Sequence, residues 1–212
     1  MLYIFDFDGT LVDSVDGIVA AMQAAIADVL LPERSHAQMS NIIGLGLAEA
    51  LQTLFPGIDD DKAEHAAERY SHHFINDHNG LVLFEGVEGV LQMLKAAGHS
   101  LAIATGKSRR GLDRVFDSSS LSQYFAYSRC ADETKSKPHP LMLNELLAET
   151  GISASDALMI GDTTYDIEMA ANAGIKSVGV SYGVHSSQQL TDAGAERVID
   201  RFDELLSLNF SS

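Results

Sequence analysis

Short apolar runs alternate with helical patterns along the second half of the chain. The runs are the right length for buried strands and cover residues 100–105, 157–160, 177–180 and 197–199. Helical patterns lie between them, at residues 109–116, 140–150, 165–173 and 187–193. Apolar strands separated by helices are typical of βαβ units, which build a parallel sheet covered on both faces. The pattern therefore predicts an α/β fold with a Rossmann-like parallel sheet, in which residues 2–7 form a central strand.

Residues 15–80 break this alternation, because their apolar positions follow a helical period and no strand pattern is found. Helices are predicted over residues 15–30, 47–55 and 59–76. An all-helical insertion of about 65 residues after the first strand is typical of a separate cap over an α/β core. We therefore expect an α/β core at 1–14 and 81–212 and a helical cap at 15–80, with hinges at 13–14 and 84–86.

Two carboxylates follow the first predicted strand, in the order Asp6-Phe7-Asp8-Gly9-Thr10. Because side chains alternate along a strand, Asp6 and Asp8 are expected to converge at its C-terminal end, where open parallel sheets bind ligands. Two neighbouring carboxylates repel one another unless a cation or a proton intervenes. An acidic turn without function would contain the same residue types, but the preceding apolar strand favours a functional site.

Three further segments place polar residues at predicted strand ends or helix starts. Asp162 follows one strand and Asp166 falls in the next helical turn, so the pair offers the oxygen ligands that Mg²⁺ prefers. Helix capping would explain one of these acids but not both. Thr105 and Gly106 offer a hydroxyl and backbone N–H groups to an anion, and Lys137 offers a positive charge. Together these segments predict a site for phosphate and a metal ion.

In order, the segments DFDGTLVDS, ATGK, KPHP and GDTTYDIEMAANAGI resemble the four motifs of the haloacid dehalogenase superfamily. The resemblance spans the whole chain and is closest to the phosphoglycolate phosphatase group, which carries a helical cap after the first motif. It implies an aspartyl-phosphate mechanism with Asp6 as the nucleophile and Asp8 as the general acid and base. The implied ligands are Thr105, Gly106 and Lys137 for phosphate and Asp6, Asp8 and Asp162 for Mg²⁺, with Asp166 supporting the metal site.

Several functions fit such a site. Hydrolysis of a small phosphomonoester is favoured, and a phosphomutase, which shares both Asp6 and Asp8, is the alternative within phosphoryl transfer. Dehalogenation is disfavoured, because the relatives that release halide lack the acid at the Asp8 position and need no metal. A binding module that had lost activity would be expected to lack Asp6, Asp8, Lys137 or Asp162, and all four are present.

The cap is expected to choose the substrate, because the core motifs handle only the phosphoryl group. Within it, Gly44, Leu45 and Gly46 are the expected contact, since two glycines flanking one residue let the backbone approach a ligand closely. The alternative is a helix end at Gly44 followed by an ordinary linker.

Two groups of side chains outside the motifs have two interpretations each. A basic group after the phosphate-site threonine either helps to hold the substrate or forms a solvated helix face. It comprises Lys107, Arg109 and Arg110. A group of cap histidines could bind zinc, but surface histidines are favoured because no cysteine pair accompanies them. It comprises His65, His72, His73 and His78.

The composition narrows the expected partners. The chain carries 30 acidic and 14 basic residues, a formal net charge of −16, and such a chain repels nucleic acid and anionic membranes. A small phosphorylated metabolite is the expected partner, and the oligomeric state is left open. Neither a basic leader nor a long apolar segment is visible, so a cytoplasmic protein is expected. The single cysteine, Cys130, cannot form an internal disulfide and is expected to be buried and inert.

Overall fold

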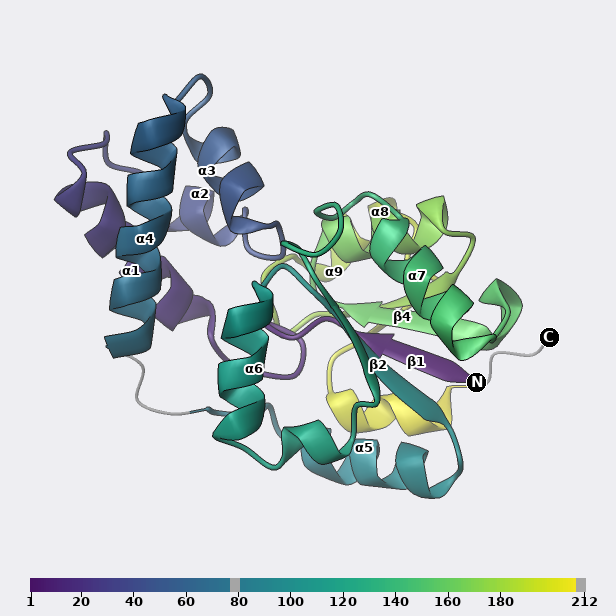
Figure 1. Ribbon diagram of the computed structural model, residues 1–212. Helices are drawn as coiled ribbons and strands as arrows, with labels where there is room; N and C mark the ends of the chain where they lie inside the picture. The colour runs from purple at the N-terminus through teal and green to yellow at the C-terminus, as the bar shows by residue number, and fades with distance from the viewer. Residues whose placement is uncertain (77–80, 209–212) are drawn as a thin grey trace.

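The computed structural model describes residues 1–76 and 81–208 of the chain. A six-stranded parallel sheet forms its centre, in the strand order β3-β2-β1-β4-β5-β6. Figure 1 labels three of these strands, β2, β1 and β4. The strands are β1 (Leu2–Phe5), β2 (Ser100–Thr105), β3 (Tyr127–Cys130), β4 (Ala157–Gly161), β5 (Lys176–Val180) and β6 (Arg197–Ile199). The predicted α/β class is therefore confirmed, and β1 lies inside the sheet between β2 and β4 as predicted.

Helices cover both faces of the sheet, as its apolar central strands β1, β2 and β4 require. One face packs against α5 (Val87–Ala96), α6 (Arg109–Asp117) and the 3₁₀ helix η3 (Phe202–Ser207). The other packs against α7 (Leu141–Thr150), α8 (Thr164–Asn172) and α9 (Ser187–Asp192). Two single-turn 3₁₀ helices, η1 (Leu121–Gln123) and η2 (Ala154–Asp156), lie in the connections.

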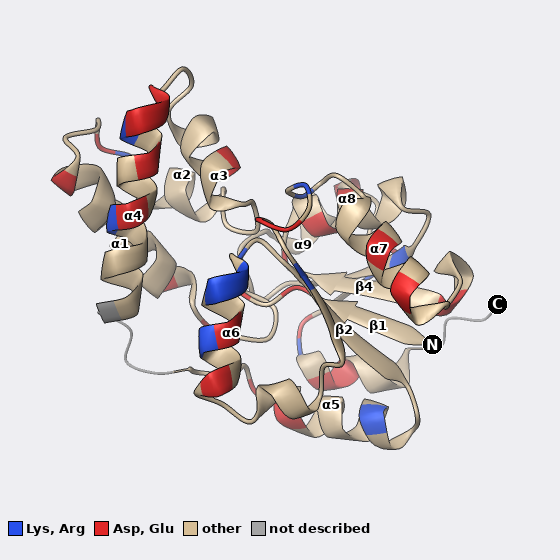
Figure 2. Cartoon of the chain, in the orientation of Figure 1, with Lys and Arg blue, Asp and Glu red and all other residues tan. Residues whose placement is uncertain are grey.

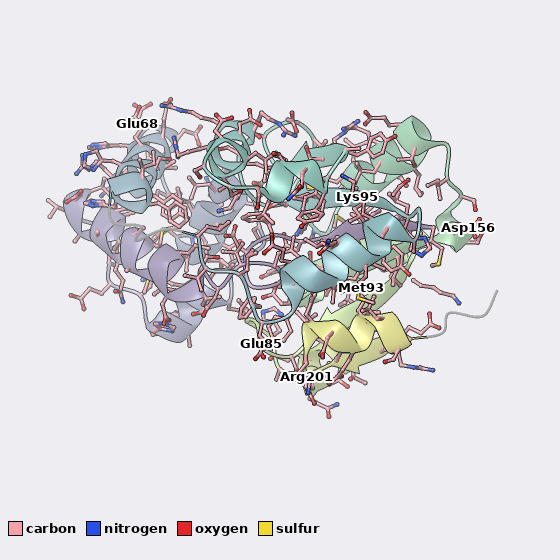
Figure 3. All side chains as sticks on the ribbon, turned by 90° about the horizontal axis from the view of Figure 1, so that it is seen from below. Glu68, Glu85, Met93, Lys95, Asp156 and Arg201 are labelled. Carbon is pink, nitrogen blue, oxygen red and sulfur yellow. The ribbon has the colours of Figure 1, made fainter. Side chains whose placement is uncertain are left out.

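The two faces divide the side chains of β1 between them. Tyr3 and Phe5 belong to the apolar cluster on the α5 side, and Leu2 and Ile4 belong to the cluster on the α7 side. Figure 3 shows the α5 side from below, with the helix that carries Met93 lying beside η3, which it contacts. This packing leaves the C-terminal ends of the strands as the open edge of the sheet.

Within the described residues, four helices lie between β1 and α5, and we call residues 15–76 the cap. They are α1 (Val15–Asp28), α2 (His36–Ser40), α3 (Leu47–Leu54) and α4 (Asp60–Asn76). The cap has an apolar cluster of its own, around Met22 and Leu51, separate from the two clusters of the sheet. Figure 1 shows the cap beside the C-terminal ends of the strands. We propose that it belongs to a separate unit with the predicted bounds of 15–80, of which residues 77–80 lie outside the described part of the chain. The separate apolar cluster supports this division.

The chain enters and leaves the cap through two segments that run side by side. The N–H of Asp13 donates to the carbonyl of Val82 (2.9 Å), and the N–H of Phe84 donates to the carbonyl of Leu11 (3.1 Å). Both predicted hinges, at 13–14 and 84–86, lie at this pair of crossings. No helix within residues 1–76 or 81–208 has the length and apolar character that a membrane span requires.

The first strand is shorter than predicted. Its ladder ends at Phe5 rather than Phe7, although the N–H of Asp6 still donates to the carbonyl of Ile160 (2.9 Å). The chain then turns, and the N–H of Leu11 donates back to the carbonyl of Phe7 (3.0 Å). Strand alternation therefore does not extend to Asp8, and the direction of its side chain is set by the turn.

Candidate active site

Segments that are far apart in the sequence meet at the C-terminal edge of the sheet. Asp6 follows β1, Thr105 ends β2 and Asp162 follows β4, and these three strands are neighbours. Lys137 comes from the connection between β3 and α7, and Asp166 from the first turn of α8. All five side chains are buried, so the edge of the sheet holds a group of charges that solvent does not reach.

Lys137 is the positive centre of this group. Its Nζ atom lies 2.7 Å from Oδ1 of Asp6 and 2.7 Å from Oδ1 of Asp166. One carboxylate oxygen from each of Asp6, Asp162 and Asp166 lies within 4.8 Å of the other two. A single ammonium therefore faces three buried carboxylates, and burying charges in such an excess is costly without a further cation.

Hydrogen bonds hold two of these acids in place. Asp162 accepts the hydroxyl of Thr10 at Oδ1 (2.9 Å) and the N–H of Val184 at Oδ2 (2.9 Å). Asp166 accepts both the N–H (3.1 Å) and the hydroxyl (2.8 Å) of Thr163 at Oδ2, which closes the start of α8. Asp166 thus fulfils a capping role and a charge-pairing role at once, through different oxygens.

Gly9 makes the approach of the first loop to Asp162 possible. Its φ is +79°, in the left-handed region that favours glycine, and a Cβ atom there would lie 2.2 Å from Oδ2 of Asp162. Any side chain at this position would displace the carboxylate, so the turn after β1 and the end of β4 depend on one another.

The surroundings shift the pKa values of the group. Burial raises the pKa of Asp6 well above its usual value, although Lys137 acts in the opposite direction. Burial, and then the charge of Asp166, raise the pKa of Asp162 to about 7. Burial alone would lower the pKa of Lys137, but the carboxylates of Asp166 and Asp6 raise it above its usual value. The lysine is therefore held charged, and the acids are short of positive charge.

The residues fit a divalent cation. Oδ2 of Asp6 is buried and has no hydrogen-bond partner among the described residues. The carboxylates of Asp162 and Asp166 lie close to Asp6 and repel it, so a cation at this position would stabilise all three. A set of carboxylate oxygens without nitrogen or sulfur ligands suits Mg²⁺, which keeps part of its water shell. Asp6 and Asp162 would hold the ion, and Asp166 lies within the same group.

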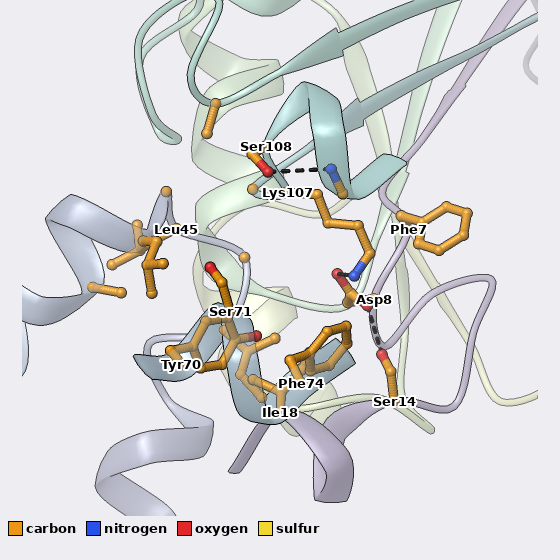
Figure 4. Close-up of a pocket in the computed structure, with 18 of the residues that line it drawn as sticks. Phe7, Asp8, Ser14, Ile18, Leu45, Tyr70, Ser71, Phe74, Lys107 and Ser108 are labelled. Carbon is orange, nitrogen blue, oxygen red and sulfur yellow. Dashed lines mark hydrogen bonds and ion pairs between the residues drawn. The ribbon is translucent and has the colours of Figure 1, made fainter. Parts of the chain in front are cut away.

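The carboxylate of Asp8 lies outside this group. Its Oδ1 accepts the hydroxyl of Ser14 (2.7 Å), and its Oδ2 lies 2.9 Å from Nζ of Lys107 (Figure 4). The close group of carboxylates therefore contains Asp166 and not Asp8, because the turn after Phe5 directs Asp8 toward the cap. The predicted roles of Asp8 as a metal ligand and as the general acid and base both stay predictions.

The expected phosphate residues meet the expected cap loop. Oγ1 of Thr105 accepts the N–H of Lys107 (3.2 Å), which shapes the turn after β2. A Cβ atom at Gly106 would lie 2.5 Å from the carbonyl oxygen of Leu45 and 2.6 Å from that of Gly44. The cap backbone thus passes directly over the segment expected to bind phosphate.

A second bond fixes the same loop to the core. The N–H of Gly46, at the start of α3, donates to Oγ of Ser136 (2.8 Å), one residue before Lys137. A cavity of about 570 Å³ lies between the cap and the edge of the sheet, with Asp6 and Asp8 in its wall. Its lining also includes Gly44, Leu45 and Gly46. The loop and the carboxylates therefore share one cavity.

The sequence gives no indication of a third contact between cap and core. Nδ1 of His185 accepts the N–H of Thr164 (2.9 Å), and Nε2 lies 3.1 Å from Oδ1 of Asn41 in the cap. The hydroxyl of Tyr165 donates to the carbonyl of Asn41 (3.0 Å). His185 could have been noticed in the sequence because it comes shortly after β5, the strand next to β4.

The cap histidines and the basic group are placed as follows. Nε2 of His73 lies 2.7 Å from Oδ2 of Asp28, and Arg69 binds the same oxygen. Within the described residues, no close group of possible metal ligands contains a histidine, and His78 lies outside them. Arg109 pairs with Glu133 (2.8 Å).

Comparison with known proteins identifies the family. The family described as "Haloacid dehalogenase-like hydrolase" matches residues 3–180. "Probable phosphatase IndB" from Dickeya dadantii is 36% identical over 211 residues, covering 97% of this chain and 91% of that protein. "Phosphoglycolate phosphatase" from Aliivibrio fischeri is 32% identical over 216 residues, covering 98% of this chain and 95% of that protein. The crystal structure of a hydrolase from Pseudomonas syringae matches with a TM-score of 0.89 and 25% identity, covering 98% of this chain and 96% of that chain.

These matches agree with the fold and the buried carboxylates. The chain belongs to the haloacid dehalogenase-like hydrolase family, which confirms the resemblance seen in the sequence. The relatives are named as phosphatases, and the predicted class of enzyme, a phosphatase, is confirmed with them.

Proposed function

We propose that this phosphatase is Mg²⁺-dependent and hydrolyses a small phosphomonoester through a phosphorylated Asp6. The observation that carries the proposal is the state of the Asp6 carboxylate. One of its oxygens pairs with Lys137, and the other is buried without a hydrogen-bond partner among the described residues. A carboxylate held in this way has one oxygen free for bonding to phosphorus or to a metal ion.

In the first step, an oxygen of Asp6 attacks phosphorus and the bond from phosphorus to the leaving oxygen breaks. Asp8 gives its proton to that oxygen, so the product leaves as an alcohol. Lys137, together with Thr105 and the N–H groups after β2, would bind the phosphoryl oxygens. Mg²⁺, when bound, would neutralise charge on the phosphoryl oxygens in the transition state.

In the second step, the ionised Asp8 takes a proton from a water molecule, and the water oxygen attacks the phosphorus of aspartyl-phosphate. The bond from phosphorus to Asp6 breaks, which releases inorganic phosphate and restores the carboxylate. Asp8 lies in the wall of the same cavity as Asp6, which supports this division of roles. Its neighbour Lys107, 2.9 Å away, would hold the ionised carboxylate in position for the second step. In the first step, the negative charge of the bound phosphate would favour the protonated form of Asp8.

Phosphate release from sugar phosphates, phosphoglycolate and nucleoside monophosphates, with Mg²⁺ and with excess chelator, tests the proposal. Asp6→Asn should lose turnover and keep its fold, because the amide has nearly the same shape and is a poor nucleophile. Asp16→Asn removes the same charge at a side chain that is 97% exposed, and should behave as the wild type.

Steady-state turnover by Asp6→Asn would contradict the nucleophile, and full activity in chelator would contradict the metal requirement. Transfer of phosphate between positions of a sugar phosphate, without release of inorganic phosphate, would favour the phosphomutase alternative. These outcomes separate the two functions that the sequence left open.

A further inference from the structure

The cavity is much larger than the reacting groups require. Its volume is about 570 Å³, within the range of roughly 300–1,000 Å³ in which proteins bind molecules of drug size. At about 30 Å³ for each water molecule in the liquid, it has room for a leaving group far larger than a short hydroxy acid such as glycolate. Size alone therefore favours a substrate with a substantial body beyond the phosphoryl group.

Part of the cavity wall, contributed by the cap, is apolar. Met22 and Ile18 come from α1, and Tyr70 and Phe74 come from α4 (Figure 4). The rings of Tyr70 and Phe74 stack with their centroids 5.6 Å apart and their planes at 21°, and Nζ of Lys107 lies 4.8 Å from the centre of the Phe74 ring. The two rings form an aromatic part of the cavity surface. Such a surface gains most from a ring or another apolar body, since burying apolar area is worth about 25 cal/mol per Å².

The third feature of the cavity is basic. Arg110 and Arg114 lie one turn apart on α6, both line the cavity and both are exposed. Figure 2 shows basic residues on α6 in blue. Within residues 1–76 and 81–208, neither arginine forms an ion pair. Arg109 on the same helix, in contrast, is paired with Glu133 and Asp113. Two neighbouring guanidinium groups that form no ion pair with the described residues, in a chain with a large excess of acids, favour an anion as their ligand.

Acidic side chains also reach the cavity, but from other elements. Glu49 lies on α3, and Asp132 lies in the segment after β3 and accepts the N–H of Arg109 (2.8 Å). The charge of the cavity is therefore divided among its walls, and α6 supplies the basic one.

From these three features we infer the class of substrate: a phosphomonoester whose leaving group has an apolar, ring-sized body and a second anionic group, a carboxylate or a phosphate. The body packs on Tyr70 and Phe74, and the second anion binds Arg110 and Arg114. This inference rests on the proposed phosphatase function and assigns α6 a part in substrate selection.

Three alkyl phosphates test it, because each releases a primary alcohol and they differ only in the two features of interest. Benzyl phosphate has the ring alone, phosphoglycolate has the carboxylate alone, and carboxybenzyl phosphate, as its 3- and 4-isomers, has both. We expect the better carboxybenzyl isomer to exceed each of the others by about tenfold or more in kcat/KM, the effect of one good charged or apolar contact.

Variants then separate the two contacts. Arg110→Gln/Arg114→Gln should bring the ratio of kcat/KM for carboxybenzyl over benzyl phosphate close to one, and raising the salt concentration should lower the same ratio in the wild type. Arg197→Gln removes an exposed arginine on β6, away from the cavity, and should leave the ratio unchanged. Comparing ratios within each variant removes any difference in the amount of active enzyme.

The outcomes are distinguishable. A ratio that persists in the double arginine variant overturns the anion site, and phosphoglycolate matching carboxybenzyl phosphate overturns the apolar body. Hydrolysis of phosphoglycolate alone refutes this inference and leaves the phosphatase function standing. If the wild type with Mg²⁺ hydrolysed none of these compounds and none of the phosphomonoesters named above, the proposed function would fail and this inference with it.

Discussion

Replacing Gly106 by alanine tests the contact between the cap loop and the segment expected to bind phosphate. The new Cβ atom would lie 2.5 Å from the carbonyl oxygen of Leu45 and 2.6 Å from that of Gly44. Both are backbone atoms, so no side-chain rotation relieves the overlap. The N–H of residue 106 is kept, and any direct hydrogen bond from it to phosphate is kept with it.

The size of the effect follows from these distances. Ordinary contacts of a Cβ atom begin at 3.4 Å, so the cap loop has to retreat by about 1 Å to restore normal packing. A displacement of that size around a reacting group costs roughly a hundredfold in rate. The cost in stability should be smaller, about 1–3 kcal/mol at most, because the loop can move outward into solvent.

The measurements are kcat/KM with Mg²⁺ and amide hydrogen exchange over residues 41–46, which should become faster as the loop loses its contacts. Gly89→Ala is the matched control, because a Cβ atom there meets nothing within 4 Å and its position is helical. The control should keep full activity and gain about 0.5–1 kcal/mol of stability. A Gly106→Ala enzyme with kcat/KM within twofold of the wild type and unchanged exchange would refute the reasoning.

Three further predictions concern other contacts. Gly46→Val places a branched side chain against Ala131, because a Cβ atom at position 46 would lie 3.0 Å from Cβ of Ala131. The value of kcat/KM should therefore fall most for substrates long enough to reach the loop. An equal fall for all substrates would contradict this. Lys137→Met leaves buried carboxylates uncompensated and should cost about 3–5 kcal/mol in denaturant unfolding without metal, and less with Mg²⁺; an unchanged midpoint would contradict the pairing. Burial raises the pKa of Cys130 to about 12, so a thiol reagent at pH 8 should react only as fast as the protein unfolds. Because the thiol loses its proton more easily in the unfolded chain, stability should fall as the pH rises from about 9 toward 12. Rapid labelling of the folded protein would contradict the burial of Cys130.

The strand ends of this fold could be predicted because parallel strands buried on both faces are short continuous apolar runs in the sequence. Asp6, Thr105 and Asp162 each adjoin an apolar run, so their meeting at one edge follows from the parallel sheet alone. The edge strand β3 is not a continuous apolar run, because half of it consists of Ser128 and Arg129. The hydrophobic pattern therefore predicts no strand there.

The partners of these residues could not be predicted in the same way. The period of a strand gives the direction of Asp6, but the chain leaves the ladder before Asp8, and only the folded turn shows that Asp8 pairs with Lys107. The bond between His185 and Asn41 joins residues that are 144 positions apart, and neither lies in a recognisable motif. Contacts of this kind depend on how the cap lies on the core, which no local pattern records.

The net negative charge of the chain does not prevent binding of an anionic substrate, because exposed charges act only over short distances in salt solution. At physiological ionic strength, exposed charges are screened over about 8 Å, so a small phosphorylated molecule in the cavity responds mainly to the groups that line it. Those groups include the basic side chains of Lys107, Arg110 and Arg114. The acids Asp6, Asp8, Glu49 and Asp132 also line the cavity, and Lys137 pairs with Asp6. A long polyanion would extend beyond this basic patch over a surface with a net excess of acids, and its repulsion would grow with its length. The basic side chains of the cavity are therefore within reach of a small phosphorylated substrate, and we expect a long polyanion such as a nucleic acid to be repelled.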